Sequence, residues 1–512
     1  MVLPLERRAY PILESVTELV ATGLKGLARH SAVYTAGDVL NRGIAFLLIP
    51  LYTAFLTPTD YGILAITATV ASILGVLYLQ SLETALTRFH YDLTDPEDRR
   101  RYYGTIWLLM VGFVIAASLV MELIGPSLAS LVFADVPYVP YLRLVVWTTA
   151  LTNSTFVLLR AALRVQERPV AFIALNIGVF LIDTAFVIYF VAVRGQGALG
   201  NLQGRFLGTL LVAVPAAVVY LRQARLQWSG DDARASLRFA LPLIPHLLSL
   251  WVLNLSDRVV LQRYVSLAEV GIYSLGYQVA AIVQLFAFSA MNAWSPYFYK
   301  TAGQPGASRT LARFATYYWL VVLVLATGVS VLAKDVLAIM ASRPAYHVAY
   351  RVVPWVAFGF VMRGFYFVFV TALYYTKRVK ALPIVTVAAG LLNIGLNLLL
   401  VPRYGYMAAA VNTFVAYAAQ AVVMYFLAQR AYSLPYEVAR VTKMAAVGLA
   451  IMAVSLALPP LSPWPGLAVR CVLLLTFPLW VTLLNFWTKD EKLAFAGAAR
   501  RLTALPTWRR RA

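Results

Sequence analysis

The sequence predicts an all-α polytopic membrane protein with about fourteen transmembrane helices. Of its 512 residues, 61% are hydrophobic and only 13% are charged, which is about half the charged share of a soluble domain. The mean hydropathy is +0.75. Apolar runs of about 20 residues recur along the chain, and each is long enough to cross roughly 30 Å of hydrocarbon as a helix. A soluble fold of this length would need a polar surface that this composition does not supply.

The apolar runs set the order of the predicted spans and of the domains. The spans cover residues 31–56, 61–82, 103–123, 141–163, 170–193, 198–221, 238–256, 270–295, 316–337, 352–375, 382–401, 407–428, 441–458 and 467–487. The predicted domains are a cytoplasmic amphipathic lead-in (1–30), an N-terminal six-helix lobe (31–222), a C-terminal six-helix lobe (237–430), helices 13 and 14 (440–488) and a basic cytoplasmic tail (489–512).

The net charge of +21 follows the loops of this topology. With the N-terminus placed in the cytoplasm, most of the Lys and Arg residues fall on the cytoplasmic side, which is the positive-inside bias of a cytoplasmic-membrane protein. Both termini are then cytoplasmic, and part of the charge is available to anionic lipid headgroups. Nucleic-acid binding is not expected, because no folded basic module accompanies the charge. The single cysteine, Cys471, has no internal partner, and no Cys/His spacing predicts a metal site.

An internal repeat divides the first twelve spans into two halves. The segments LTPTDYGILA (Leu56–Ala65) and SLAEVGIYSL (Ser266–Leu275) each place an acid, one residue and a glycine at the start of a helix, 209 positions apart. The segments RGQGALGN (Arg194–Asn201) and RYGYMAAAVN (Arg403–Asn412) begin at the same offset. Six spans per repeat is an even number, so both halves enter the membrane in the same direction. Two six-helix bundles related by a pseudo-twofold axis along the membrane normal are typical of transporters, with the cargo path between them.

The same segments carry a resemblance to a known family. Tyr34–Ala65 (YTAGDVLNRGIAFLLIPLYTAFLTPTDYGILA), Leu241–Ala280 and Leu391–Thr413 (LLNIGLNLLLVPRYGYMAAAVNT) resemble polysaccharide and lipid-linked oligosaccharide flippases of the multidrug/oligosaccharidyl-lipid/polysaccharide superfamily. The resemblance implies outward translocation of undecaprenyl-diphosphate-linked glycans across a bacterial or archaeal cytoplasmic membrane by alternating access. It also implies a polysaccharide polymerase and glycosyltransferases as partners. Lipid II flippases of this superfamily share the fourteen spans, with the last two forming a groove for the lipid tail.

Charged side chains inside the spans are the candidate site residues. A charge at mid-bilayer costs about 2.5–3.5 kcal/mol even on lenient scales, so such residues face protein or water. Arginine binds phosphate oxygens through its planar fork. The predicted substrate-binding residues of a central cavity are Asn41, Arg42, Arg160, Arg205 and Arg363.

Acidic residues near these arginines are predicted to pair with them or to couple transport to an ion. Asp38 and Arg42 are spaced i, i+4 and share a helix face, so Arg42 either pairs with Asp38 or binds a phosphate while Asp38 holds it. Asp183 is a candidate partner for the arginines of other helices. Asp257 and Arg258 follow the seventh span and are expected to form an interfacial ion pair rather than a coupling-ion site.

The prolines of the seventh span give a further expectation. Pro242 and Pro245 should kink the helix, and His246 beside them is expected to be a buried imidazole.

Three functions remain open at the level of the sequence. Arginines outnumber acids within the spans, which favours an anionic cargo over the cations of a multidrug or metabolite antiporter of the same fold. A lipid II flippase fits the same pattern. A membrane glycosyltransferase or ligase is disfavoured, because the chain has no phosphate loop, no metal-ligand cluster and no large soluble domain. No cofactor is expected, and whether Na⁺, H⁺ or the membrane potential drives transport stays open.

Overall fold

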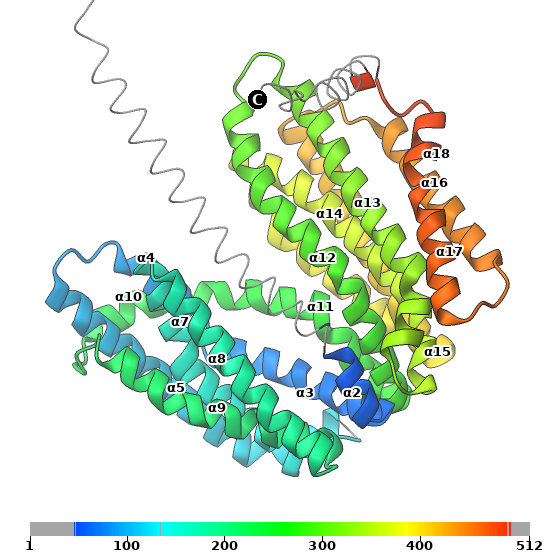
Figure 1. Cartoon of the computed structure of the whole chain (residues 1–512). Helices are drawn as coiled ribbons and strands as arrows, with labels where there is room; N and C mark the ends of the chain where they lie inside the picture. Colours follow the sequence, from blue (N-terminus) through cyan, green and yellow to red (C-terminus); the bar gives the residue numbers. More distant parts are fainter. Residues whose placement is uncertain (1–45, 47, 134, 489–490, 493–512) are drawn as a thin grey trace, which may run out of the picture. The chain divides into compact units, whose positions relative to one another are not determined.

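The computed structural model describes residues 46, 48–133, 135–488 and 491–492. Within these ranges the chain forms helices joined by turns and contains no strand (Figure 1). The all-α prediction is therefore confirmed. The lead-in, most of the first predicted span and nearly all of the basic tail lie outside the described residues.

The helices follow the apolar runs in chain order. The first group comprises α2 (Ile49–Phe55), α3 (Pro58–Leu77), α4 (Leu82–His90), α5 (Pro96–Val132), η1 (Tyr138–Leu142), α6 (Arg143–Leu151), η2 (Thr152–Val157), α7 (Leu158–Val165), α8 (Pro169–Ile188), η3 (Tyr189–Val193) and α9 (Gly197–Leu221). The second group comprises α10 (Gly230–Ala240), η4 (Leu241–Leu243), α11 (Ile244–Tyr264), α12 (Leu267–Thr301), α13 (Ala307–Met340), η5 (Pro344–Arg351), α14 (Val353–Tyr375), α15 (Ala381–Ala431), α16 (Val438–Ala457), α17 (Pro463–Leu475) and α18 (Phe477–Leu483).

Twelve helical segments of the described residues are long and apolar enough to cross a membrane. One of them, α15, holds two predicted spans, because Gly405 adopts φ 62° and ψ −155° and separates two helical arms. Every predicted span from the second to the fourteenth therefore has a matching helix. The fourteen-span prediction fits the structure, and the chain is a multi-pass membrane protein.

The seventh span differs from its prediction in two ways. The 3₁₀ turn η4 separates α10 from α11 beside Pro242 and Pro245, at the position of the predicted kink. The predicted end at residue 256 is wrong, since α11 continues to Tyr264. The prediction for His246 is also wrong: its imidazole is exposed, because it lies in the first turn of α11.

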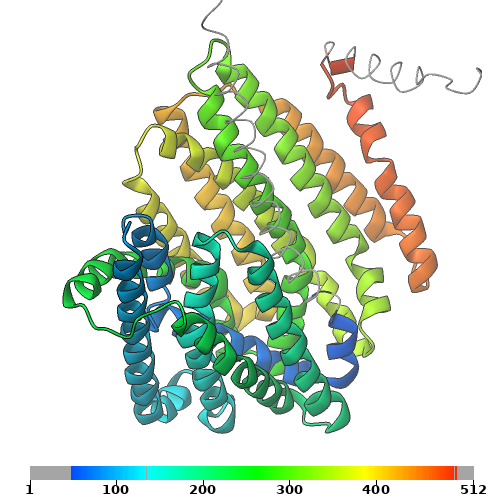
Figure 2. The same cartoon turned by 60° about the vertical axis from the view of Figure 1, so that its left-hand side comes forward.

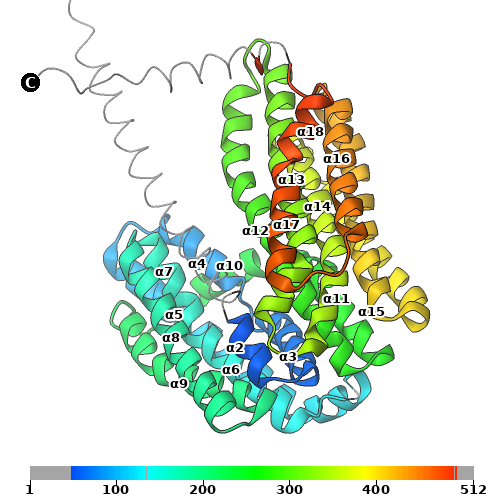
Figure 3. The ribbon, with the colours of Figure 1, turned by 45° about the vertical axis from the view of Figure 1, so that its right-hand side comes forward.

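The chain packs as two compact units. The first contains the described residues up to Leu275 together with Ala341–Tyr346 and Pro383–Asn412, and the second contains the remainder. In the first unit α8 and α9 lie side by side (Figure 2). In the second unit α13 lies beside α14, α16 and α17 (Figure 3). The lobes predicted from the repeat have other boundaries, and that division stays a prediction.

Glycines on α9 explain its close approach to α8. A Cβ atom at Gly204 would lie 2.6 Å from the Val187 nitrogen, and one at Gly208 would lie 2.8 Å from the Asp183 Cα. Small residues four apart let transmembrane helices meet backbone to backbone. This packing places Asp183 of α8 against α9, the helix that carries Arg205.

The repeated acid and glycine begin a helix in each half, as predicted. The Thr57 hydroxyl accepts from the Asp60 amide at 3.1 Å, and the Asp60 carboxylate accepts from the Thr57 amide at 2.9 Å. At the start of α12, Ser266 and Glu269 form the same reciprocal pair at 3.3 and 3.0 Å. Both are capping boxes, which satisfy the free amides of a helix start. The acids of the repeat are therefore helix caps.

The repeated glycines are where the two halves meet. A Cβ atom at Gly62 would lie 1.9 Å from the Leu267 carbonyl oxygen, and one at Gly271 would lie 2.1 Å from the Pro58 carbonyl oxygen. The first turn of α3 thus contacts the first turn of α12 backbone to backbone. Only glycine permits this contact on both sides.

Repeat-related hydrogen bonds extend this contact. The Ser342 amide donates to the Thr53 hydroxyl at 3.3 Å, and the Gln262 side chain donates to the Val132 carbonyl at 2.6 Å. Thr53 and Gln262 occupy equivalent positions of the repeat, 209 residues apart, and so do Val132 and Ala341, the neighbour of Ser342. The Tyr346 hydroxyl also donates to the Leu56 carbonyl at 3.1 Å.

We call this region the outer joint, because it lies at the loops predicted to face outward. It comprises residues 53–62, Val132, 262–271 and Ala341–Tyr346.

Candidate functional site

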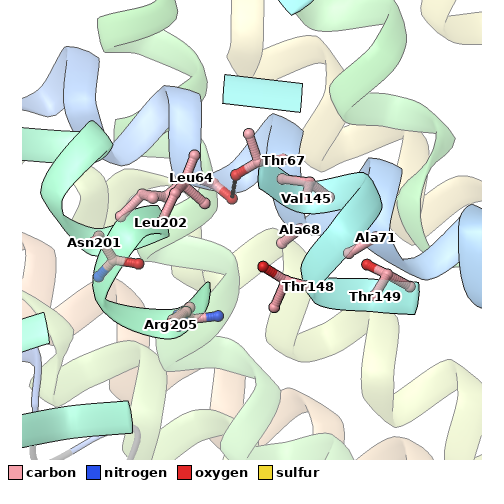
Figure 4. A pocket seen from close by; sticks show the side chains of 10 residues that line it. All are labelled: Leu64, Thr67, Ala68, Ala71, Val145, Thr148, Thr149, Asn201, Leu202 and Arg205. Carbon is pink, nitrogen blue, oxygen red and sulfur yellow. Dashed lines mark hydrogen bonds between the residues drawn. The ribbon is translucent and has the colours of Figure 1, made fainter. Parts of the chain in front are cut away.

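A cavity with a mixed polar and apolar lining lies in the first unit between α3, α6 and α9 (Figure 4). Its volume is about 130 Å³, which is room for several water molecules. We call it the Arg205 chamber. The residues that line it are Leu64, Thr67, Ala68, Ala71, Val145, Thr148, Thr149, Asn201, Leu202 and Arg205.

Helical spacing brings these residues to one space. The α3 residues of the chamber lie at positions 64, 67, 68 and 71, which is one face of a helix. Ala68 and Ala71 are small and leave the volume open. Asn201 and Arg205 are one turn apart on α9, so their side chains reach the same chamber.

Asn201 is the most unusual lining residue. Its side chain is fully buried (0% exposed), and neither its amide oxygen nor its amide nitrogen has a hydrogen-bond partner among the described residues. An unsatisfied buried polar group costs about 1–3 kcal/mol. The amide therefore offers a donor and an acceptor to a polar molecule in the chamber.

Threonine hydroxyls add acceptors around the amide. The Thr67 hydroxyl donates to the Leu64 carbonyl at 3.0 Å (Figure 4). The Thr148 hydroxyl donates to the Leu144 carbonyl at 2.7 Å. Because each hydroxyl hydrogen is used within its own helix, the oxygens remain as acceptors. The chamber thus combines a cation, an amide and hydroxyl oxygens.

Arg205 supplies the positive charge of the chamber. No carboxylate forms a direct ion pair with it in the part of the chain that the structure describes. Asp183 on α8 is close enough for the charges of Arg205 and Arg160 to act on it. The link between Asp183 and Arg205 is therefore electrostatic, without a direct ion pair among the described residues, and the Arg205 guanidinium stays available to an anion.

The other predicted arginines lie apart from the chamber. Arg160 on α7 is half-buried, with its guanidinium 5.9 Å from the Phe156 ring. Arg363 on α14 belongs to the second unit, where it donates to the Tyr417 hydroxyl at 3.1 Å. Asp38, Asn41 and Arg42 lie outside the described residues, so their roles stay predictions.

Asp257 and Arg258 form the predicted ion pair, and both are buried within α11. Their side chains are 4% and 6% exposed, and the guanidinium lies 2.7 Å from the carboxylate. The Tyr273 hydroxyl donates to the same carboxylate, and Arg258 also donates to the Asn254 carbonyl at 3.0 Å. The pair lies inside the helix because α11 runs eight residues beyond the predicted edge of the span, and its place at the membrane interface stays a prediction. A role of this pair in ion coupling stays a prediction.

Sequence reasoning missed the buried ion pair between Asp335 and Arg470 in the second unit. Both carboxylate oxygens of Asp335 on α13 accept from Arg470 on α17, at 2.9 and 2.8 Å, and both residues are 3% exposed. Arg470 also donates to Ser455 on α16 at 3.1 Å. A Cβ atom at Gly466 would lie 2.5 Å from the carboxylate. The pair fastens the last predicted spans onto α13.

A buried asparagine network in α15 was also missed. Asn397 donates to Asn393 at 3.1 Å, and Asn412 donates to Asn397 at 2.9 Å. The bond between Asn412 and Asn397 crosses the break at Gly405 and holds the two arms of α15 together. Asn393 and Asn397 are four residues apart within an apolar run, and this spacing was the signal available in the sequence.

No group of three or more His, Cys, Asp or Glu side chains among the described residues is placed to hold a metal ion. The expectation that the chain uses no cofactor stays a prediction.

The fold and the repeat define the class of protein: a polytopic helical membrane protein with two related halves and two added helices. Residues 27–302 match the family described as "Polysaccharide biosynthesis protein", and residues 242–399 match the MatE family. Because the first match covers more than half of the chain, the chain belongs to the polysaccharide biosynthesis protein family of the multidrug/oligosaccharidyl-lipid/polysaccharide superfamily.

Similar curated proteins are flippases. The "Lipid III flippase" of Escherichia coli (strain K12) is 24% identical over 255 residues, which is 48% of this chain and 61% of that protein. The protein of the same name from Shigella flexneri matches equally. The matched region thus spans about three fifths of the length of these relatives.

Solved structures share the fold. "Lipid II flippase MurJ, inward closed conformation" has a TM-score of 0.68 at 12% identity, over 87% of this chain and 98% of that chain. The inward-facing conformation of a multidrug resistance MATE family transporter has a TM-score of 0.65 at 12% identity, over 77% and 94%. At these identities the likeness shows the fold alone.

Proposed function

We propose that this chain is a flippase that moves an undecaprenyl-diphosphate-linked oligosaccharide from the inner to the outer leaflet of the cytoplasmic membrane by alternating access. The cargo is a repeat unit of a polysaccharide, an O-antigen or an exopolysaccharide. The observation that carries the proposal is the Arg205 chamber, where an arginine without a direct ion pair lies beside a buried, unpaired amide.

The chemistry of the chamber suits an anionic cargo. Arginine binds phosphate with two parallel hydrogen bonds, and the Asn201 amide with the threonine oxygens suits the hydroxyls of a sugar. The flippase names among the relatives support the same cargo class. A second candidate is a multidrug antiporter, which the likeness to a MATE transporter favours. The cationic lining of the chamber disfavours it, because such a site repels cations.

Movement outward is favourable for an anion in a cell with a negative interior. One charge gains about 2.3 kcal/mol per 100 mV, so a diphosphate with two charges gains roughly 4–5 kcal/mol. The potential is therefore a sufficient driving force in this proposal, and a coupling Na⁺ or H⁺ would act at acids such as Asp183. The proposed setting has both termini in the cytoplasm of a bacterium or archaeon, with glycosyltransferases supplying the cargo and a polymerase using it. The chain itself is proposed to carry out no bond chemistry.

The test is transport of a labelled cargo in liposomes that contain the full-length chain. Arg205→Ala should lower the rate by about 10- to 100-fold, because a hydrogen bond to a charged group contributes about 1.5–3 kcal/mol, and Arg205→Lys should restore part of it. Arg222→Ala, at the other end of α9, is the control and should keep the wild-type rate.

Equal rates for Arg205→Ala and Arg222→Ala would refute the role of the chamber. Wild-type liposomes that move a cationic dye but no lipid-linked glycan would favour the antiporter.

A further inference from the structure

A second and larger cavity lies in the first unit between α11 and the turn that joins α3 to α4. Its volume is about 390 Å³, within the roughly 300–1,000 Å³ range of small-molecule sites. We call it the Trp251 cavity. It is lined by Ser72, Val76, Gln80, Ser81, Glu83, Thr84, Leu247, Leu250, Trp251, Asn254 and Leu255.

An unusual turn builds one wall of the Trp251 cavity. Leu79 has φ 55°, a left-handed conformation that non-glycine residues rarely adopt. The Gln80 amide donates back to the Gly75 carbonyl at 3.1 Å. A Cβ atom at Gly75 would lie 3.0 Å from the Gln80 amide oxygen, so the glycine makes room for this side chain. The turn thereby presents Gln80 and Ser81 to the cavity.

Ser81 lines the cavity with an unused hydroxyl. The residue is 3% exposed, and its oxygen has no hydrogen-bond partner in the described part of the chain. Although Ser81 is the N-cap residue of α4, its side chain does not cap that helix. A buried hydroxyl of this kind is satisfied when a polar molecule binds beside it.

The charges of the Trp251 cavity exclude the phosphate part of the cargo. No Lys or Arg lines it, and its one carboxylate, that of Glu83, forms an ion pair with Arg164 at 3.2 Å. Among the lining residues a diphosphate would meet one carboxylate and no guanidinium, since Arg164 is engaged by Glu83 from outside the lining. The Arg205 chamber, on another part of α3, has the opposite character.

The remaining lining suits an uncharged sugar. Hydroxyls and amides from Ser72, Gln80 and Thr84 offer donors and acceptors. The opposite wall on α11 is mainly apolar, with three leucines and the indole of Trp251 beside one amide, that of Asn254. The indole nitrogen donates to the Thr69 carbonyl at 3.2 Å, which fixes the ring. A sugar ring has hydroxyls at its rim and C–H groups on its faces, so it matches both walls.

We infer that the Trp251 cavity is a subsite for an uncharged sugar residue of the cargo, separate from the arginines that hold its phosphates. This inference rests on the proposed flippase function. It assigns the specificity for the glycan to the turn at Leu79–Ser81 and to α11.

The test separates glycan affinity from phosphate affinity. The full-length chain is placed in lipid nanodiscs free of maltoside detergent, whose sugar would compete for the cavity. The probes are undecaprenyl diphosphate and the same lipid carrying glucose, galactose or N-acetylglucosamine. Wild type should bind at least one glycosylated probe about 10-fold or more tighter than the bare lipid.

Three variants target the subsite. Ser81→Ala, Gln80→Ala and Trp251→Phe should each remove most of this gain and leave the affinity for bare undecaprenyl diphosphate unchanged. Ser81→Ala removes only an unpaired hydroxyl, so the fold should tolerate it. Ser249→Ala is the matched control, because that hydroxyl lies on α11 outside the cavity lining and bonds to the Pro245 carbonyl at 2.8 Å.

Each result decides one of the two proposals. The subsite is overturned if the wild type binds none of the glycosylated probes more tightly than the bare lipid. It is also overturned if all three variants keep the higher affinity for the glycosylated probe. Variants that weaken binding of the bare lipid also overturn it, since phosphate would then occupy the cavity. Wild type that binds neither form of the lipid instead refutes the flippase function.

Discussion

Replacing Gly62 or Gly271 with alanine is expected to force apart the two helix starts that meet in the outer joint. The added Cβ atoms would lie 1.9 Å from the Leu267 oxygen and 2.1 Å from the Pro58 oxygen. Carbon and oxygen atoms approach to about 3.3–3.6 Å at their closest. The helices would therefore have to separate by more than about 1 Å. Because both obstacles are backbone atoms, no side-chain rotation relieves either clash.

The magnitude follows from overpacking and from helix propensity. Overpacking a tight contact costs about 1–3 kcal/mol, and a rigid backbone contact belongs at the upper end. Gly178 on α8 and Gly395 on α15 are matched controls, because no atom lies within 4 Å of a Cβ built there. Alanine at these two positions should be neutral or stabilising by about 0.5–1 kcal/mol.

The reciprocal geometry adds a coupling that can be measured. Once Gly62→Ala has separated the helices, Gly271→Ala should find space, because its Cβ would also lie 2.8 Å from the Gly62 nitrogen. The double variant should therefore lose less free energy of unfolding than the sum of the two single variants, by about 1 kcal/mol or more.

The free energy of unfolding is measured by SDS titration in mixed micelles for both single variants, the double variant and the controls. The reciprocal contact would be refuted if Gly62→Ala and Gly271→Ala lowered the free energy of unfolding no more than Gly178→Ala does. It would also be refuted if the losses of the two single variants simply added in the double variant.

Two further predictions concern other parts of the chain. Arg470→Met should destabilise the second unit by about 3–5 kcal/mol, because it leaves the buried Asp335 carboxylate without a counter-charge, and adding Asp335→Leu should recover most of the loss in the same titration. His90 lies in the predicted cytoplasmic loop, and burial and the charge of Arg99 lower its pKa below the ordinary value of 6.5. The unfolded chain therefore binds the proton more readily than the folded chain does. The free energy of unfolding should accordingly fall as the pH drops below about 6.5. His90→Gln should flatten the fall in melting temperature between pH 7.5 and pH 5.5, and an unchanged slope would contradict this assignment.

The spans and the repeat were predictable because they depend on local properties of the chain. The length of each apolar run predicts where a helix lies. The acid and the glycine of the repeat recur in the sequence at an offset of 209 residues. Their physical roles were not predictable. Asp60 and Glu269 turned out to cap their helices, and Gly62 and Gly271 to touch the opposite half. The first role needs backbone geometry and the second needs the tertiary contact.

The candidate site was predictable only in part. Arg205 stood out as a charge inside an apolar run, and the structure places it in a polar chamber. Asn201 carries no charge and raised no signal, because an unpaired amide is visible only once its neighbours are known. Asp335 and Arg470 lie 135 positions apart, so their pairing depends on how α13, α16 and α17 pack.

The outer joint has the energy scale that a transport gate requires. Hydrogen bonds from Ser342, Gln262 and Tyr346 cross between the two halves. Each contributes about 0.5–1.5 kcal/mol net, so together they contribute only a few kcal/mol. Under the proposed function, two charges that cross a potential of 100 mV gain roughly 4–5 kcal/mol. Under the proposed function, the energy that the cargo gains is therefore of the same order as these three hydrogen bonds and is sufficient to offset their loss.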